Sequence, residues 1–225
     1  MSTIELQAAD GHRLGAYRAG PDQPGRSLVV IQEIFGVNHH LRSVCDAFAA
    51  EGFSVIAPAL FDRVQRGLEL GYTPDDVAAG REWRSKVPEA GTMADVEAAA
   101  AALGSGSIGS GPIGIVGYCW GGTIAWWGAT RSTRFKAAVG WYGGGIAATR
   151  AEAPHCPVQL HFGELDRGIP LTDVDSIRQA QPGVEIFVYP GTGHGFGCDE
   201  RDSFDPAARD LARERTLEFL HRHMG

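Results

Sequence analysis

Short apolar runs recur along the chain, with helical patterns between them. Each run is continuous and not alternating, which is typical of strands buried on both faces of a parallel sheet. The runs are Leu28–Ile31, Phe53–Ala57, Ile113–Val116, Ala137–Trp141, Val158–Phe162 and Val184–Val188. Helical spacing separates most of them. This alternation predicts an α/β fold with a mostly parallel central sheet and helices on both faces.

The sequence also predicts the helices and turns that lie between these strands. In the segment from His40 to Ala50, the apolar residues Leu41, Val44, Phe48 and Ala49 share one side. The other predicted helices are Pro74–Lys86, Thr92–Leu103, the segment after Gly121, a segment between the last two strands, and Pro206–His223, which carries Leu211, Leu217 and Leu220. At the N-terminus, Asp10-Gly11 predicts a hairpin turn. The Gly/Ser-rich residues 104–112 predict a surface loop.

Length and charge narrow the possible functions. A chain of 225 residues suits one large α/β domain, and we expect residues 1–225 to form it. The net charge of −7 argues against nucleic acid as a partner, because that requires a basic face. The longest apolar runs fall far short of the ~20 residues needed to span a bilayer, so no membrane association is expected. The chain should be a monomer or a weak homodimer.

The cysteines and the N-terminal residues indicate the cellular compartment of the protein. Cys45, Cys119, Cys156 and Cys198 are scattered, with no Cys-x-x-Cys pair. The first residues lack the basic and then apolar form of a signal peptide. We therefore expect reduced thiols and a cytoplasmic protein.

The segment around Cys119 carries the clearest chemical signal. Gly117-Tyr118-Cys119-Trp120-Gly121 lies between a predicted strand and a predicted helix. Strand, Gly-x-nucleophile-x-Gly and helix form the nucleophile-elbow pattern, in which small residues permit a sharp turn. Most elbows carry serine, and a thiol here would lie at a helix N-terminus, where the dipole favours the thiolate. Cys119 is the predicted nucleophile.

A nucleophile of this kind needs a histidine as its base and an acid to orient that histidine. In this pattern the expected order along the sequence is nucleophile, acid and then histidine. Among eight histidines, His194 follows the last predicted strand and has a glycine on each side, which suits a loop close to another backbone. His161 lies within an apolar strand and is better explained as a hydrogen-bonded core residue. His221 and His223, on the terminal helix, are expected to be solvated. His194 is the predicted base.

The sequence also predicts the orienting acid and the oxyanion donors. Asp166 and Glu164 both follow the penultimate strand, and Asp166 is preferred because a short side chain at a strand end can reach His194. Glu164 stays open as the rival. After the first buried strand, the backbone N–H of Ile34, with that of Trp120, is expected to form the oxyanion hole. Glu33 beside it either places a carboxyl near the thiol or forms a structural ion pair.

Taken together, these segments resemble the dienelactone hydrolase family of α/β-hydrolases along nearly the whole chain. The resemblance rests on Gln32-Glu33-Ile34-Phe35-Gly36, Pro58-Ala59-Leu60-Phe61, Gly117-Tyr118-Cys119-Trp120-Gly121-Gly122, Gly163-Glu164-Leu165-Asp166 and Gly193-His194-Gly195-Phe196. It implies a hydrolase without a cofactor or metal, acting on a small lactone or ester. It also implies that Glu33 holds the resting thiol and helps to ionise it, and that substrate binding swings the thiol toward His194.

The chain departs from the family where substrate is recognised. Members of the family resemble one another in using two arginines to bind a substrate carboxylate. At the position of one arginine this chain has Gly197-Cys198-Asp199, and at the position of the other it has an acidic segment, residues 73–77. Arg81, Arg84, Arg63 and Arg201 are the possible substitutes. The expected substrate-binding residues are the aromatic ones near the motifs together with one arginine: Phe35, Trp83, Tyr118, Tyr142, Phe196 and Arg81.

Two other classes of function compete with a hydrolase. A small-molecule receptor on the same fold would bind ligands without turnover, but such proteins usually lack a member of the triad, and this chain keeps all three. A redox or metal role for the cysteines is disfavoured, because their spacing does not match a metal site.

Overall fold

The computed structural model describes residues 2–22, 25–104 and 111–225, and the chain divides into two compact units, Met1–Gly114 and Ile115–Gly225. In the described residues the strands are β1 (Ser2–Gln7), β2 (Arg13–Ala19), β3 (Arg26–Ile31), β4 (Phe53–Pro58), β5 (Ile113–Tyr118), β6 (Phe135–Trp141), β7 (Val158–Gly163) and β8 (Glu185–Tyr189). The α-helices are α1 (His39–Ala50), α2 (Pro74–Lys86), α3 (Glu89–Gly104), α4 (Trp120–Arg131), α5 (Leu171–Ala180) and α6 (Pro206–Met224). The short 3₁₀ helices are η1 (Leu60–Arg63) and η2 (Ala147–Thr149).

The first unit contains a sheet with the strand order β1-β2-β4-β3. β1 and β2 form the predicted antiparallel hairpin, and Gly11 in its turn has φ +85° and donates its N–H to the carbonyl of Ala8 at 2.9 Å. β2 pairs with β4 antiparallel, and β3 pairs with β4 parallel. Parallel pairing therefore begins at β3, the first continuous apolar run of the sequence.

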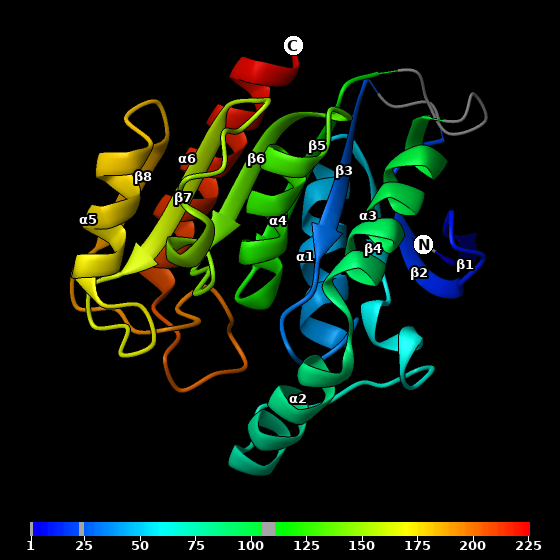
Figure 1. The fold of residues 1–225 in the computed structure, drawn as a ribbon, viewed down its shortest axis with the longest axis horizontal. Coiled ribbons are helices and arrows are strands. Elements are labelled where there is room, and N and C mark those ends of the chain that lie inside the picture. Colours follow the sequence, from blue (N-terminus) through cyan, green and yellow to red (C-terminus); the bar gives the residue numbers. More distant parts are fainter. Residues whose placement is uncertain (1, 23–24, 105–110) are drawn as a thin grey trace. The chain divides into compact units, whose positions relative to one another are not determined.

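Both faces of this sheet are covered by helices. Every residue of β4 is buried, and successive side chains of a strand point to opposite faces, so both faces must be packed. Helices α1 and α3 both contact β4, and Figure 1 draws α1 behind it and α3 in front. On α1 the buried apolar residues are Leu41, Cys45 and Phe48, whereas Val44 is only half-buried. Of the predicted apolar side, Leu41 and Phe48 are thus buried, and Val44 and Ala49 are half-buried.

The second unit contains the strand order β5-β6-β7-β8, with β6, β7 and β8 parallel. Helix α4 packs on β6, and α6 packs on β6 and β7 from the face drawn behind them in Figure 1. The buried side of α6 is Ala212, Thr216, Phe219, Leu220 and Met224. Leu211 is exposed, and His223 is half-buried with its ring 4.6 Å from that of Phe219, although it was expected to be solvated; His221 is exposed.

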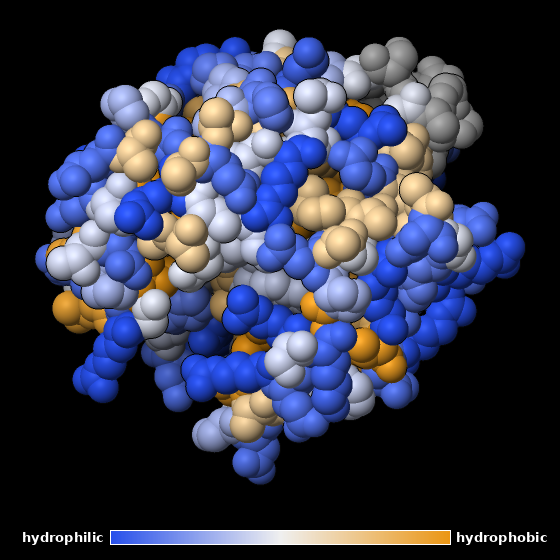
Figure 2. Space-filling view, viewed as in Figure 1, coloured by the Kyte–Doolittle hydropathy of each residue, from blue (hydrophilic) through white to orange (hydrophobic). Residues whose placement is uncertain are grey.

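The element types predicted from the sequence are confirmed, and most bounds agree within two residues. Helix α3 begins at Glu89, three residues before Thr92, and η1 and η2 were not predicted. Of the predicted Gly/Ser loop, residues 105–110 lie outside the described residues. In the part of the chain that the structure describes, each helix is too short or too polar to cross a membrane. The face drawn in Figure 2 is mostly hydrophilic, with hydrophobic residues in small groups.

Candidate active site

The backbone turns sharply at Cys119, between β5 and α4. Cys119 has φ 55° and ψ −114°, a conformation that an L-residue rarely adopts and that costs free energy. Its carbonyl accepts the N–H of Gly122 at 3.0 Å, so the helix starts at once, and Trp120 is buried in the first turn. Cys119 itself is half-buried, so its side chain keeps access to solvent. This is the geometry of a nucleophile elbow.

Glycine is required on both sides of this turn. A Cβ at Gly117 would lie 1.9 Å from the carbonyl oxygen of Gly121, and one at Gly122 would lie 2.4 Å from the carbonyl oxygen of Trp141. Both are backbone atoms, so the chain could not give way without opening the turn. The N–H of Cys119 donates to that same Trp141 carbonyl at 2.9 Å, which anchors Cys119 to the end of β6.

His194 lies between the thiol and a carboxylate. Its Nδ1 is 2.7 Å from Oδ2 of Asp166, and its Nε2 is 3.1 Å from Sγ of Cys119. The other carboxylate oxygen of Asp166 accepts the N–H of Gly168 at 2.8 Å, so both oxygens of this buried side chain are occupied. Cys119 and Asp166 are 47 positions apart in the sequence, and Asp166 and His194 are 28 apart. In the fold they form a continuous series of contacts, with His194 in the middle.

The charges of this group favour an ion pair. Burial by itself lowers the pKa of His194, but the Cys119 thiolate and the Asp166 carboxylate more than offset it and raise the pKa to about 10. With this pKa the imidazole keeps its second proton at neutral pH. Nδ1–H then donates to Asp166, and Nε2–H donates to the sulfur of Cys119.

The loops after β7 and β8 are held to each other by several contacts. Leu165 donates its N–H to the carbonyl of Thr192 at 2.8 Å, and the carboxylate of Glu164 accepts the N–H of Gly191 at 2.8 Å. Gly163 lies so close that a Cβ there would be 2.6 Å from the Thr192 carbonyl oxygen. Glu164 therefore holds the loop of His194, whereas Asp166 contacts the imidazole itself.

His161 is a buried, hydrogen-bonded core residue, as the sequence predicted. It is fully buried, with Nδ1 2.8 Å from the hydroxyl of Tyr189 and Nε2 2.9 Å from Oε1 of Gln159. Burial, with a smaller effect of the Arg215 charge, lowers the pKa of His161 to about 3, so it is neutral. Its contact with Tyr189 joins β7 to the end of β8, the two strands that precede the loops of Asp166 and His194. Sequence reasoning did not assign it this supporting position.

The expected aromatic residues of the second unit form one buried cluster. Tyr118, Tyr142 and Phe196 are all buried, and the ring of Tyr142 lies 6.3 Å from Tyr118, 5.5 Å from Phe196 and 5.1 Å from His194. Trp141 stacks on Phe196 at 5.6 Å and joins the same cluster. Within this cluster, the ring of Tyr142 makes the contact with the imidazole of His194.

The expected site residues of the first unit gather around the end of β3. Glu33, Ile34 and Phe35 are buried directly after the strand. Helix α2 approaches them closely, because a Cβ at Gly80 would lie 2.3 Å from the carbonyl oxygen of Ile34. Arg81 and Trp83 follow on α2, where Arg81 is exposed and Trp83 is half-buried under the Lys86 ammonium, 4.2 Å from its ring centre.

A side-chain hydrogen bond links two of the sequence motifs in this unit. The side-chain oxygen of Gln32, which is fully buried, accepts the N–H of Leu60 at 3.1 Å. Leu60 opens η1, so Gln32 satisfies a helix N–H that would otherwise be buried without a partner. The hydrogen bond thus joins the segment Gln32-Glu33 to the segment Pro58-Ala59-Leu60.

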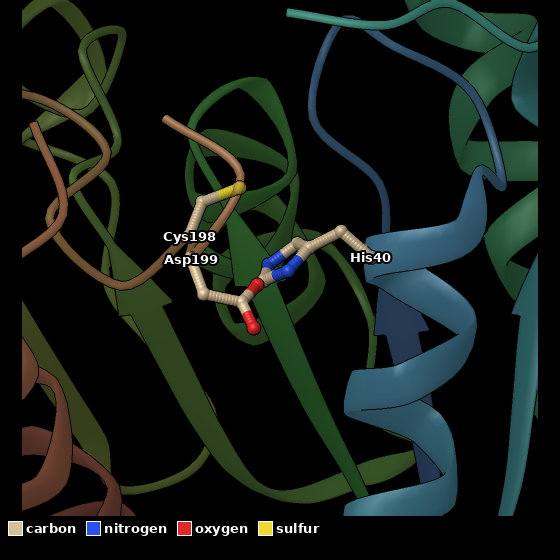
Figure 3. A group of neighbouring side chains, drawn as sticks. All are labelled: His40, Cys198 and Asp199. Carbon is tan, nitrogen blue, oxygen red and sulfur yellow. The ribbon is translucent and has the colours of Figure 1, made fainter. Parts of the chain in front are cut away.

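The other cysteines and the possible metal ligands take no part in the contacts of Cys119, His194 and Asp166 described above. All four cysteines are free thiols, and Cys198 is fully buried in the loop between β8 and α6, next to the exposed Asp199. Figure 3 draws these two residues together with His40, which belongs to α1 of the first unit. Among the described residues, neither unit by itself has three His, Cys, Asp or Glu ligands grouped closely enough to hold a metal ion.

Comparisons with known proteins agree along the chain. The sequence model of the dienelactone hydrolase family matches residues 14–224. A carboxymethylenebutenolidase of Pseudomonas putida is 32% identical over 227 positions, covering 96% of this chain and 94% of that protein. A Synechocystis protein that is provisionally named a carboxymethylenebutenolidase is 38% identical over 225 positions. The match covers 92% of this chain and 91% of that protein.

A solved structure confirms the fold. The crystal structure of a provisionally named dienelactone hydrolase from Klebsiella pneumoniae has a TM-score of 0.83 and 31% identity, and the match covers 98% of this chain and 99% of that one. The expected α/β-hydrolase fold is thereby confirmed.

Proposed function

Because the chain belongs to the dienelactone hydrolase family of hydrolases, we propose that it hydrolyses lactones or activated esters through Cys119, His194 and Asp166. The observation that supports this most directly is the position of the His194 imidazole, 3.1 Å from the thiol and 2.7 Å from the carboxylate. Nucleophile, base and orienting acid are the parts that acyl transfer requires.

In the first half of the reaction, the thiolate of Cys119 attacks the carbonyl carbon of the substrate. A C–S bond forms, and the electron pair of the C=O bond moves onto oxygen to give a tetrahedral oxyanion. When this collapses, the C–O bond to the leaving group breaks, and the proton on Nε2 of His194 goes to the departing alkoxide. In a lactone the alcohol stays attached to the acyl group, so the ring opens.

In the second half, water attacks the thioester. Neutral His194 takes a proton from the water as it adds to the carbonyl carbon, and collapse of the second tetrahedral species breaks the C–S bond. The thiolate and the imidazolium are restored, and the acid product leaves. Asp166 accepts the Nδ1–H bond throughout, so it keeps the ring orientation in which Nε2 faces the sulfur.

The remaining roles rest on the family resemblance and on the places of the residues in the chain. The backbone N–H groups of Ile34 and Trp120 donate to the oxyanion. Glu33 assists ionisation of the thiol. Of the substrate contacts named from the sequence, Trp83, Tyr118 and Arg81 keep that role in this scheme, whereas Phe35, Tyr142 and Phe196 are fully buried and would act by packing behind them. No cofactor takes part in this scheme.

The cellular setting is also part of the proposal. Four free thiols suit a reducing compartment, so we place the protein in the cytoplasm, as a monomer or a weak homodimer. Its partner is then a small-molecule ester or lactone, with no nucleic acid and no membrane involved.

The test compares two cysteine variants on a panel of lactones and aryl esters. Cys119→Ala should lose turnover by about 10³-fold or more, because it removes the nucleophile. Cys198→Ala, which changes a buried cysteine outside the triad, should keep most of it. Equal activity of Cys119→Ala and the unchanged protein would refute the proposal. Tight ligand binding without turnover of any panel member would favour a receptor instead.

A further inference from the structure

The backbone is strained at Tyr142, next to the proposed active site. Tyr142 has φ 39°, and apart from Cys119 it is the other non-glycine residue with positive φ in the part of the chain that is described. Such a conformation costs free energy and persists only where the surroundings enforce it. At Cys119 the positive φ is explained by the elbow turn, whereas no motif in the sequence predicts the positive φ at Tyr142.

Three segments of the active site meet at this residue. The Trp141 carbonyl, one residue before, accepts the N–H of the nucleophile Cys119 at 2.9 Å. The N–H of Tyr142 donates to the carbonyl of His161 at 2.7 Å, which ties it to β7, the strand that leads to Asp166. Gly143, one residue after, is pressed against α4, since a Cβ there would lie 2.8 Å from the Thr123 nitrogen.

The side chain of Tyr142 completes the arrangement by contacting the base. Its ring centre lies 5.1 Å from that of His194 at an angle of 61°, an edge-to-face pair. The two hydrogen bonds of His194 hold Nδ1 and Nε2, and the ring remains attached to the backbone through Cβ. The Tyr142 ring adds a packing contact that restricts rotation of this side chain about χ1 and χ2.

The burial of Tyr142 favours a role through His194 over direct contact with substrate. The residue is 0% exposed, and its ring also packs on Phe196. The backbone of Gly197 approaches the phenol closely, because a Cβ there would lie 3.2 Å from the hydroxyl oxygen. The side chain is thus fixed from several directions.

We propose that Tyr142 is a positioning residue: its strained backbone directs the aromatic ring against His194 and holds the imidazole in line with Cys119. The proposal rests on the function proposed above. The titratable groups that face His194 are Cys119 at the start of α4, Asp166 after β7 and Tyr142 after β6, and the guanidinium of Arg201 packs on the neighbouring Gly195.

The experiment compares Tyr142→Leu, which removes the ring, with Tyr142→Phe, which keeps it. We expect Tyr142→Leu to lower kcat about 10- to 100-fold with KM changed less than about twofold, since small misalignments of catalytic groups cost this much. Tyr142→Phe should restore kcat to within about threefold. If circular dichroism shows that the Leu variant is unfolded, Tyr142→Met takes its place.

A second readout requires no substrate. Iodoacetamide alkylates the Cys119 thiolate, and the rate against pH, followed by intact mass, reports how well the imidazolium stabilises that thiolate. A poorly held imidazole stabilises it less, so the acid limb of the profile should move to higher pH, by about half a unit or more, in Tyr142→Leu but not in Tyr142→Phe. Phe187→Leu is the matched control, because Phe187 stacks on His161 at 5.7 Å; its kcat and alkylation profile should stay unchanged.

The outcomes separate the two proposals. Wild-type kcat and alkylation in Tyr142→Leu, with Cys119→Ala inactive, would overturn only the positioning role. A higher KM with unchanged kcat would also overturn it, because it would indicate direct substrate contact. An active Cys119→Ala variant would overturn the proposed function itself.

Discussion

The carboxylate of Asp166 lies 2.7 Å from Nδ1 of His194, whereas the carboxylate of Glu164, two residues earlier, accepts the backbone N–H of Gly191. Both acids follow β7, and both hold the loop of the histidine. Only Asp166 contacts the ring, and its side chain is fully buried while Glu164 is exposed. The two residues therefore offer a matched pair for testing which acid orients the base.

Asp166→Asn should reduce kcat by about 10²- to 10⁴-fold with a smaller change in KM. The amide keeps the size of the side chain, but it removes the charge that stabilises the imidazolium, and it permits the wrong tautomer of His194. Glu164→Gln keeps an oxygen that can accept the Gly191 N–H, so its kcat should stay within about fivefold. Steady-state kinetics on one aryl ester measures both. The reverse order of effects would identify Glu164 as the orienting acid.

The pKa of His194 should fall when the sulfur is removed. The pKa of about 10 depends on the thiolate and Asp166 overcoming the effect of burial. In Cys119→Ala the thiolate is gone and burial remains, so the imidazole should lose its proton at a lower pH. An NMR titration of the His194 ring resonances measures this directly. The ion-pair description would be wrong if the two proteins titrated at the same pH.

Acid should destabilise the fold through His161. Its pKa is about 3 when folded and about 6.5 when unfolded, so between these values the unfolded chain binds the extra proton. Stability from this residue is therefore present above pH ~6.5 and is lost as the pH falls, by up to about 1.4 kcal/mol per pH unit.

Urea unfolding at several pH values between 4 and 6.5 checks this expectation. His161→Gln should be less stable at neutral pH but should have a shallower dependence on pH than the unchanged protein. His155→Gln, at an exposed histidine, is the control and should keep the original slope. Identical slopes in His161→Gln and the unchanged protein would show that another group causes the acid sensitivity.

A buried ion pair supports the first unit. Asp95 is fully buried and accepts Nε–H and Nη2–H bonds from Arg63, each 2.7 Å long, and Arg63 also bonds Asp10 in the β1–β2 turn. Burial raises the pKa of Asp95, and Arg63 opposes this effect. Removal of one partner leaves the other charge buried.

Asp95→Ala should therefore lower the free energy of unfolding by about 3–5 kcal/mol. Glu82→Ala removes an exposed partner of Lys86 on α2 and should leave the stability nearly unchanged. Chemical denaturation of the two variants gives the comparison. A small loss in Asp95→Ala would mean that Arg63 finds solvent or Asp10 at little cost.

Much of the fold could be read from local patterns. Continuous apolar runs identified the buried strands, and glycines around Cys119 identified the elbow, because only glycine fits where backbone atoms lie about 2 Å from a Cβ position. Helix faces were predicted in part. On α1 the predicted apolar side did not include Cys45, which is buried, and Val44 on that side is half-buried, because the angle of a helix against its sheet depends on both surfaces. That residues 1–225 form a single domain stays a prediction.

The sequence by itself determined which kinds of residue end each strand, and so which groups were available for catalysis: a thiol, two acids and an imidazole. Which of Asp166 and Glu164 contacts the His194 ring, and where the Tyr142 ring packs, were decided by tertiary structure. Both depend on atoms that are distant in the chain, namely the Gly191 amide, the His194 ring and the His161 carbonyl. Local propensity contains no information on such distances, which are set by how β6, β7 and β8 align.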